Sequence, residues 1–123
     1  MKGALTMKKI AALTCLHSND VCARVSCLSA FNNRTAFFAG YPQDTVLAAM
    51  MTCNGCRSMT ETADDKGMSE KIDRLVSENI ETVHVGVCCL NRNGEECPRI
   101  TAICHMIGDR GIMVVRGTHR ESH

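Results

Sequence analysis

The chemistry of this sequence is concentrated in its thiols. Nine cysteines occur among 123 residues, and two of them, Cys53 and Cys56, are separated by only two residues. Two thiolates at this spacing can bind one tetrahedral metal ion, and Gly55 supplies the backbone freedom for the turn between them. The same spacing also occurs in dithiol redox centres. The pair therefore predicts a metal site or a reactive dithiol.

The segments that must position the thiols alternate between strand and helix patterns. Apolar runs and alternation predict strands at residues 8–15, 45–53, 82–90 and 112–115, and amphipathic spacing predicts helices at 24–33, 68–79 and 97–110. Such alternation is typical of a parallel sheet with helices on both faces. We therefore predict an α/β fold, a small three-layer open sheet of about four mostly parallel strands.

The carboxyl ends of parallel strands lie at one edge of a sheet, where open α/β folds bind their ligands. Each predicted strand ends in a thiol or leads into an imidazole, so we expect a metal site at this edge. The candidate ligands are Cys15, Cys22, Cys27, Cys53, Cys56, Cys88, Cys97 and His119. Cys104 lies inside an isoleucine stripe and Cys89 must point away from Cys88, so both are predicted to be core residues.

Length and composition narrow the classes of protein. The chain is long enough for one domain, predicted at residues 7–119, with an extension at 1–6 and a tail at 120–123. The net charge of +1 and the lack of a lysine and arginine stripe argue against nucleic-acid binding. No apolar run approaches the length of a membrane span. The odd cysteine count argues against a secreted disulfide scaffold, so we predict a cytoplasmic protein with reduced thiols.

Several segments together resemble the CGGC domain family. They are Cys15, Cys22 and Cys27 around the first loop, residues 30–34, residues 52–56, residues 83–88, residues 97–100 and residues 117–119. The resemblance covers about residues 7–119, and it departs from the family's namesake tetrapeptide at Asn54, which replaces a glycine. It implies a metal-binding protein, commonly inferred to bind zinc, and it implies no particular reaction.

Three functions remain open from the sequence. The first is metal binding, with zinc favoured and an iron–sulfur cluster as the alternative, although the cysteine spacing matches no common ferredoxin run. The second is a thiol–disulfide oxidoreductase that uses Cys53 as nucleophile and Cys56 as its resolving partner. The third is an interaction module that a structural metal holds together. The sequence defines neither an enzyme activity, nor a protein partner, nor a small-molecule substrate.

Overall fold

The structure is a computed structural model that describes residues 8–55, 64–90 and 93–119. The predicted extension at 1–6, the predicted tail at 120–123 and Cys56 lie outside these ranges. None of the helices in the described part of the chain is long and apolar enough to cross a bilayer.

One parallel sheet forms the centre of the described residues. Its strands are β1 (Lys9–Thr14), β2 (Val46–Thr52), β3 (Thr82–Val85) and β4 (Met113–Arg116). They are arranged in the order β2-β1-β3-β4, and each neighbouring pair is parallel. The predicted α/β fold is therefore confirmed, with each strand near its predicted position.

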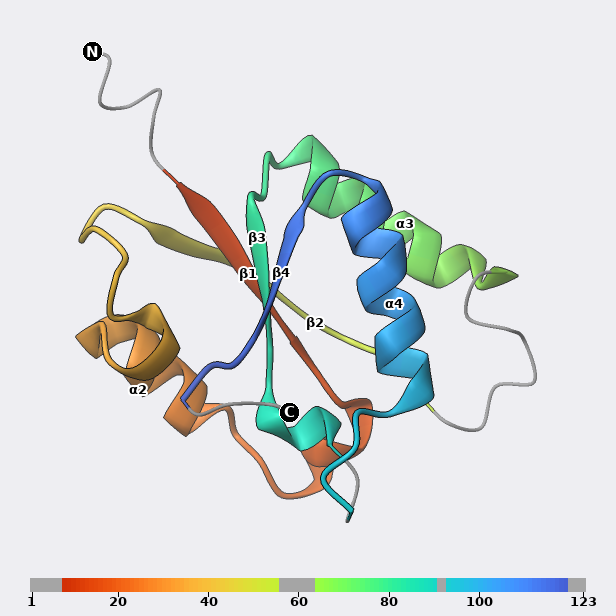
Figure 1. The fold of residues 1–123 in the computed structure, drawn as a ribbon, viewed down its shortest axis with the longest axis horizontal. Coiled ribbons are helices and arrows are strands. Elements are labelled where there is room, and N and C mark those ends of the chain that lie inside the picture. The colour runs from red at the N-terminus through yellow and green to blue at the C-terminus, as the bar shows by residue number, and fades with distance from the viewer. Residues whose placement is uncertain (1–7, 56–63, 91–92, 120–123) are drawn as a thin grey trace.

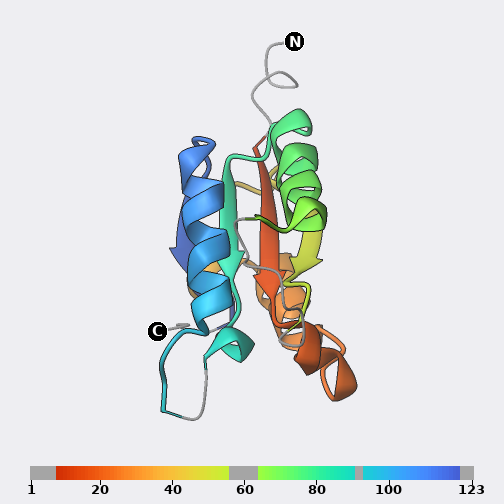
Figure 2. The ribbon, with the colours of Figure 1, turned by 90° about the vertical axis from the view of Figure 1, so that its right-hand side faces the viewer.

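Helices cover both faces of the sheet (Figures 1 and 2). The α-helices are α2 (Val25–Asn33), α3 (Lys66–Ser77) and α4 (Pro98–Asp109), and the short 3-10 helices are η1 (Leu16–Asp20), η2 (Ala36–Phe38) and η4 (Val87–Cys89). In Figure 1, α2 lies to the left of the sheet, and α3 and α4 lie to its right. Each face therefore has its own hydrophobic core.

The central strand β1 contributes to both cores. Ala11 and Leu13 pack into the α3/α4 core, whereas Ile10 packs into the α2 core. Because both of its faces are covered, the strand is apolar throughout rather than alternating. On α4, the predicted isoleucine stripe with Cys104 is buried against the sheet, and Pro98 occupies the first turn, where a missing N–H costs nothing.

The predicted strand at 82–90 was wrong in its second half. The strand ends at Val85, whose neighbours are Leu13 and Arg116, and no further residue is paired along β3. The amide of Gly86 donates to the carbonyl of Leu13 at 2.9 Å, and the chain then turns into η4. Alternation of valines continued past the last paired residue, so the pattern alone extended the strand too far. Residues 16–22, between the first predicted strand and the first predicted helix, were also expected to be a loop, but residues 16–20 form η1.

The strand order has a functional consequence. From β1 the chain passes through α2 to β2 on one side, whereas from β3 it passes through α4 to β4 on the other side. The crevice between the ends of β1 and β3 is therefore the switch point of the sheet, the place where open α/β sheets bind ligands. The segments that follow these two strands lie side by side at the lower end of the molecule in Figures 1 and 2.

Candidate metal centre and thiol pocket

Three thiols follow three neighbouring strands at this edge, and we call Cys15, Cys53 and Cys88 the strand-end thiols. The amide of Cys15 donates to Sγ of Cys88 at 3.3 Å, and the amide of Leu16 donates to Sγ of Cys53 at 3.5 Å. Successive amides of an extended chain point in opposite directions, so the end of β1 reaches one thiol on each side. Main-chain donors of this kind stabilise the negative charge of a thiolate.

The pKa of the Cys88 thiol is lowered from 9.0 to about 5. The largest cause is a hydrogen bond from the thiol of Cys89, and the Cys15 amide, the Ser18 hydroxyl and the charge of Arg24 act in the same direction, while burial opposes them. The same hydrogen bond, together with burial, raises the pKa of Cys89. Cys88 is therefore the member of this adjacent pair that ionises.

Cys15 lies between the other two strand-end thiols. Burial raises the pKa of its thiol, and the charges of Cys53 and Cys88 raise it further, while backbone hydrogen bonds oppose them. Three thiolates this close repel one another in the absence of a cation. A bound metal ion would remove that repulsion, because it compensates the charge of all of its thiolate ligands.

A second group of chemically active side chains lies on the α2 side of the same edge. A pocket of about 210 Å³, which we call the thiol pocket, opens at the crevice between β1 and β3. Its lining residues are Thr14, Cys22, Arg24, Ser26, Cys27, Gly86, Val87, Cys88 and His119. Cys88 belongs to both groups, since it lines this pocket and also packs against the α3/α4 core.

Cys27 is held at the pocket by the C-terminal segment of the described chain. Its Sγ lies 3.2 Å from Oγ1 of Thr118 and 3.6 Å from Nδ1 of His119. Thr118 is fully buried, and its carbonyl accepts a hydrogen bond from the amide of Phe37 at 3.2 Å. These contacts join α2, η2 and the segment after β4 into one wall of the pocket.

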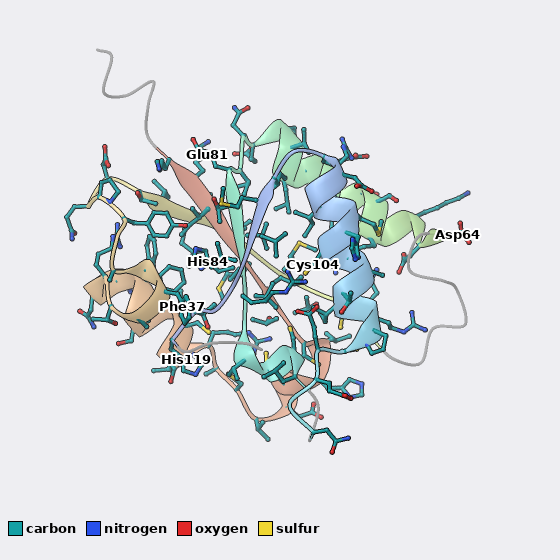
Figure 3. All side chains as sticks on the ribbon, viewed as in Figure 1. Phe37, Asp64, Glu81, His84, Cys104 and His119 are labelled. Carbon is teal, nitrogen blue, oxygen red and sulfur yellow. The ribbon has the colours of Figure 1, made fainter. Side chains whose placement is uncertain are left out.

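The buried His84 supports this wall from inside the sheet. Its Nδ1 lies 2.8 Å from the carbonyl oxygen of Gly117, and its Nε2 lies 2.7 Å from the Tyr41 hydroxyl. A carbonyl can only accept, so Nδ1 carries the proton and Nε2 accepts from Tyr41. Burial lowers the pKa of His84, which keeps the ring neutral in this arrangement. Figure 3 shows His84 on the α2 side of the sheet, with Phe37 and His119.

The turn that starts the Cys53–Cys56 pair is fixed to α3. The side chain of Asn54 donates to Asp65 at 2.9 Å and accepts from Lys71 at 2.7 Å, and Asp65 caps the helix by accepting from the Met68 amide at 3.1 Å. The hydrogen bond from Asn54 is the largest cause that lowers the pKa of Asp65. Asn54, which departs from the family pattern, therefore provides a side-chain anchor that a glycine lacks.

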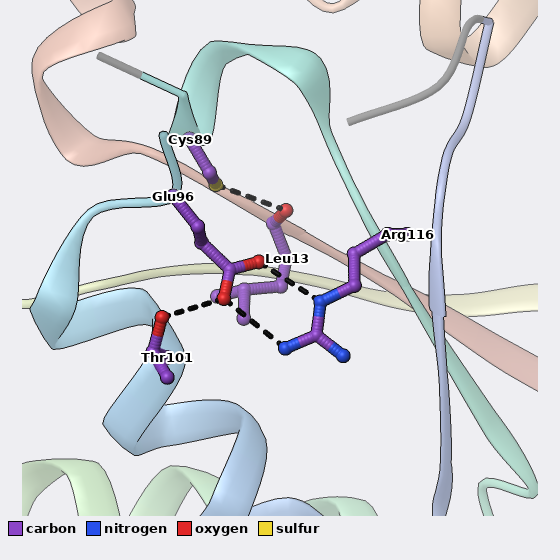
Figure 4. Close-up of polar contacts among 5 residues, drawn as sticks. All are labelled: Leu13, Cys89, Glu96, Thr101 and Arg116. Carbon is purple, nitrogen blue, oxygen red and sulfur yellow. Dashed lines mark hydrogen bonds and ion pairs between the residues drawn. The ribbon is translucent and has the colours of Figure 1, made fainter. Parts of the chain in front are cut away.

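A partly buried ion pair supports the chain between η4 and α4 (Figure 4). The guanidinium of Arg116 contacts both carboxylate oxygens of Glu96, at 3.0 and 3.1 Å, and the Thr101 hydroxyl donates to the same carboxylate at 2.6 Å. Above this pair in Figure 4, Sγ of Cys89 lies 3.8 Å from the carbonyl oxygen of Leu13. The network connects β4 to the segment that leads into Cys97 and α4.

The predicted ligands are thus distributed over two sides of one edge. Cys15, Cys53 and Cys88 lie together, while Cys22, Cys27 and His119 surround the thiol pocket. Cys97 is half-buried at the start of α4 against the α3/α4 core, and Cys56 is not among the described residues. Within residues 8–55, 64–90 and 93–119, no three histidine, cysteine or acidic side chains converge closely enough to hold a metal ion.

Several residues of the site were not identified from the sequence. Thr118 contacts Cys27, Arg24 and Ser18 favour the ionised form of Cys88, and Cys89 acts through its hydrogen bond to Cys88. Thr118 lay within a motif that carried the family resemblance, which was a usable signal. Arg24 and Ser18 carry no such signal, because their proximity to Cys88 arises only when the segments after β1 and β3 come together.

Comparison with known proteins identifies the family. The sequence model of the CGGC domain matches residues 9–119. The chain belongs to the CGGC domain family. CGGC domains are generally regarded as metal-binding, and the cysteine-rich composition of this chain agrees with that description. No curated protein and no solved structure was found to match the chain.

Proposed function

We propose that this CGGC domain binds zinc through the strand-end thiols Cys15, Cys53 and Cys88, with Cys56 as the fourth ligand. The observation that carries the proposal is the pair of hydrogen bonds from the consecutive amides of Cys15 and Leu16 to two sulfurs. Hydrogen bonds from main-chain N–H groups are typical of the second shell around metal-bound thiolates, where they orient the ligand and spread its charge.

The donor set fits a metal that prefers sulfur. Zinc forms tetrahedral sites with four cysteine thiolates in many structural centres. The three strand-end thiols do not converge on one point in this structure, so metal binding requires their side chains to rotate. The cytoplasm, where thiols stay reduced, is the location that suits such a centre.

The dithiol alternative for Cys53 and Cys56 is less well supported. Only 4% of the Cys53 residue is exposed, and it packs in the α3/α4 core. Reactive thiols are partly exposed and lie in electropositive surroundings, whereas buried ones are inert. A buried ligand sulfur, by contrast, is normal for a structural metal. Burial of Cys53 therefore favours ligation over nucleophilic attack.

The test compares two buried cysteines on the same side of the sheet. The protein is purified without oxygen or added metal, and zinc, iron and acid-labile sulfide are measured per chain. We expect about one zinc per chain and no sulfide in the wild type. Cys53→Ser should lose most of the metal, whereas Cys104→Ser should keep it, because Cys104 lies on α4 among core isoleucines.

Other outcomes contradict the proposal in different ways. Detection of iron with acid-labile sulfide would mean that the same thiols hold an iron–sulfur cluster rather than zinc. Absence of any metal, or equal metal content in the two variants, would remove the strand-end site. In zinc-bound protein, substitution by Co²⁺ gives an absorption spectrum that reports the number of thiolate ligands, which checks the ligand set directly.

A further inference from the structure

The thiol pocket lies at the switch point of the sheet, on the opposite side from the α3/α4 core that buries Cys53. We propose that it is a second site, for thiol–disulfide exchange with a small anionic disulfide, in which Cys88 attacks and Cys22 resolves. The exchange is a reaction of the metal-free protein and goes beyond the proposed metal binding.

Cys88 is accessible from the pocket. It is half-buried rather than buried, and its neighbour Gly86 leaves the approach open. A Cβ atom at Gly86 would lie 3.5 Å from Sγ of Cys88 and 3.2 Å from Cγ2 of Thr14, so a side chain there would fill the space beside the sulfur. The amide of Cys15 donates to the sulfur from the opposite segment at 3.3 Å. The sulfur thus accepts a main-chain hydrogen bond on one side and is reachable by a small molecule from the pocket.

The electrostatics of the pocket select an anionic partner. Arg24 lines it, and its side chain donates to the carbonyl of Cys22 at 3.0 Å, which holds the guanidinium at the pocket. Ser26 and Cys27, in the first turn of α2, also line it, and a helix N-terminus carries partial positive charge. Among the described residues that line the pocket there is no carboxylate. A disulfide that carries carboxylates is therefore favoured over one that carries ammonium groups.

Cys22 is suited to the second step. It is exposed, and it lies in the short segment between η1 and α2, outside every strand and helix of the sheet framework. Val21 and Val25, on either side of this segment, are 91% and 69% exposed. A segment with so few buried contacts moves at low cost. Cys22 and Cys88 line the same pocket, and a disulfide between them requires this segment, rather than β1 or α2, to move.

The reaction balances without a further reagent. The thiolate of Cys88 attacks one sulfur of the small disulfide, the sulfur–sulfur bond breaks, and the first small thiol leaves as a thiolate with the bonding electrons. Cys22, as its thiolate, then attacks Sγ of Cys88 and releases the second small thiolate, while its own proton passes to solvent. The small disulfide is reduced to two thiols, and Cys22 and Cys88 are oxidised to one disulfide.

The experiment uses metal-free, reduced protein and oxidised glutathione as the anionic probe, with cystamine as a cationic disulfide of similar reactivity. Intact mass should show a transient mixed disulfide followed by an internal disulfide, and peptide mapping should locate both on Cys88. Cys22→Ser should stop at the mixed disulfide. Cys88→Ser should lose the reaction, whereas Cys104→Ser should keep it.

Arg24→Gln tests the charge selection. It should slow the reaction with oxidised glutathione several-fold and leave the reaction with cystamine unchanged or faster. A first mixed disulfide on any other cysteine of the wild type, which requires no variant to fold, would overturn the proposal. Equal rates for the two probes in wild type and Arg24→Gln would overturn the anionic partner. Metal content is measured on separate samples, so a negative result for one of the two proposals leaves the test of the other unaffected.

Discussion

The thiols on the two sides of the sheet edge are positioned by different kinds of element. The strand-end thiols Cys15 and Cys53 belong to the framework: each follows a strand directly, and both pack against the α3/α4 core. The thiol pocket is assembled mainly from connecting segments, with Cys22 before α2 and His119 after β4. Among the described cysteines, Cys88 alone belongs to both regions.

This difference separates two kinds of chemistry. A metal centre gains from ligands that hold their positions, and strands with a packed core provide such positions. An exchange reaction needs a thiol that a small molecule can reach and a partner thiol that can move. The chain therefore places a rigid region and an adaptable region at one edge, and variants that disturb only one of them should leave the other unchanged.

The largest difference between the two regions is expected for Gly117→Ala, which should disturb the thiol pocket and leave the strand-end thiols unchanged. A Cβ atom at this position would lie 2.5 Å from the ring of Phe37, which is backbone-anchored through the Phe37 amide to Thr118. Such overpacking should lower the free energy of unfolding by roughly 1–3 kcal/mol. Urea unfolding measures this loss, and thiol labelling should show faster modification of Cys27, because its contacts to Thr118 and His119 are displaced.

The control for Gly117→Ala is a second substitution at Phe37, whose ring the new Cβ atom would contact. Phe37→Ala in the same chain removes the clash and should restore slow labelling of Cys27, since the segment after β4 can return to its place. Zinc content should not change in either variant. A loss of zinc in Gly117→Ala would break the comparison, because it would mean that the two regions are one site.

A smaller effect, on the other side of the sheet, is expected for Glu96→Gln. The change keeps the shape of the side chain but removes the charge that holds Arg116 and supports the segment before α4. Glu96 is only 11% exposed and Arg116 is 36% exposed, so the pair is partly shielded from solvent. We expect a loss of roughly 1–2 kcal/mol in the free energy of unfolding, measured with urea.

Glu70→Gln is the matched control for this prediction. Glu70 pairs with Arg74 one turn along α3 at 2.6 Å, and both side chains are largely exposed. Exposed pairs of this spacing contribute little to stability, because water screens both charges. Labelling of Cys22 and Cys88 should be the same in both variants. Equal destabilisation by the two changes would show that the Glu96 network contributes no more than a surface pair.

The fold could be predicted from the sequence because local patterns decide it. The apolar run of β1 and the isoleucine stripe of α4 are readable from residue order, since burial on two faces or on one stripe dictates their periods. The end of β3 was not readable, because it depends on where β1 and β4 stop offering partners. Strand pairing depends on the neighbouring strands, and the alternation of valines does not indicate where that pairing ends.

The candidate site could be predicted only as a location. The topology of a parallel sheet places the residues after each strand at one edge, so the gathering of Cys15, Cys53 and Cys88 follows from residue order and strand assignment. The division into two sides did not follow. It depends on the direction in which each side chain leaves the main chain and on the course of short segments, as the contact between Cys27 and Thr118 illustrates.

The smallest effect concerns His84, whose hydrogen bond to Gly117 supports the thiol pocket from within the sheet. Burial lowers its pKa below the ordinary 6.5 in the folded state. The unfolded state therefore binds more protons below about pH 6.5, and stability is lost as the pH falls through that value until the folded ring also titrates. His84→Asn keeps a donor for the Gly117 carbonyl but does not titrate. Its thermal midpoint should therefore fall less than the wild type's between pH 7.5 and 5.5. An unchanged slope in His84→Asn would mean that other groups carry the pH dependence and that the ring supports the pocket wall in either protonation state.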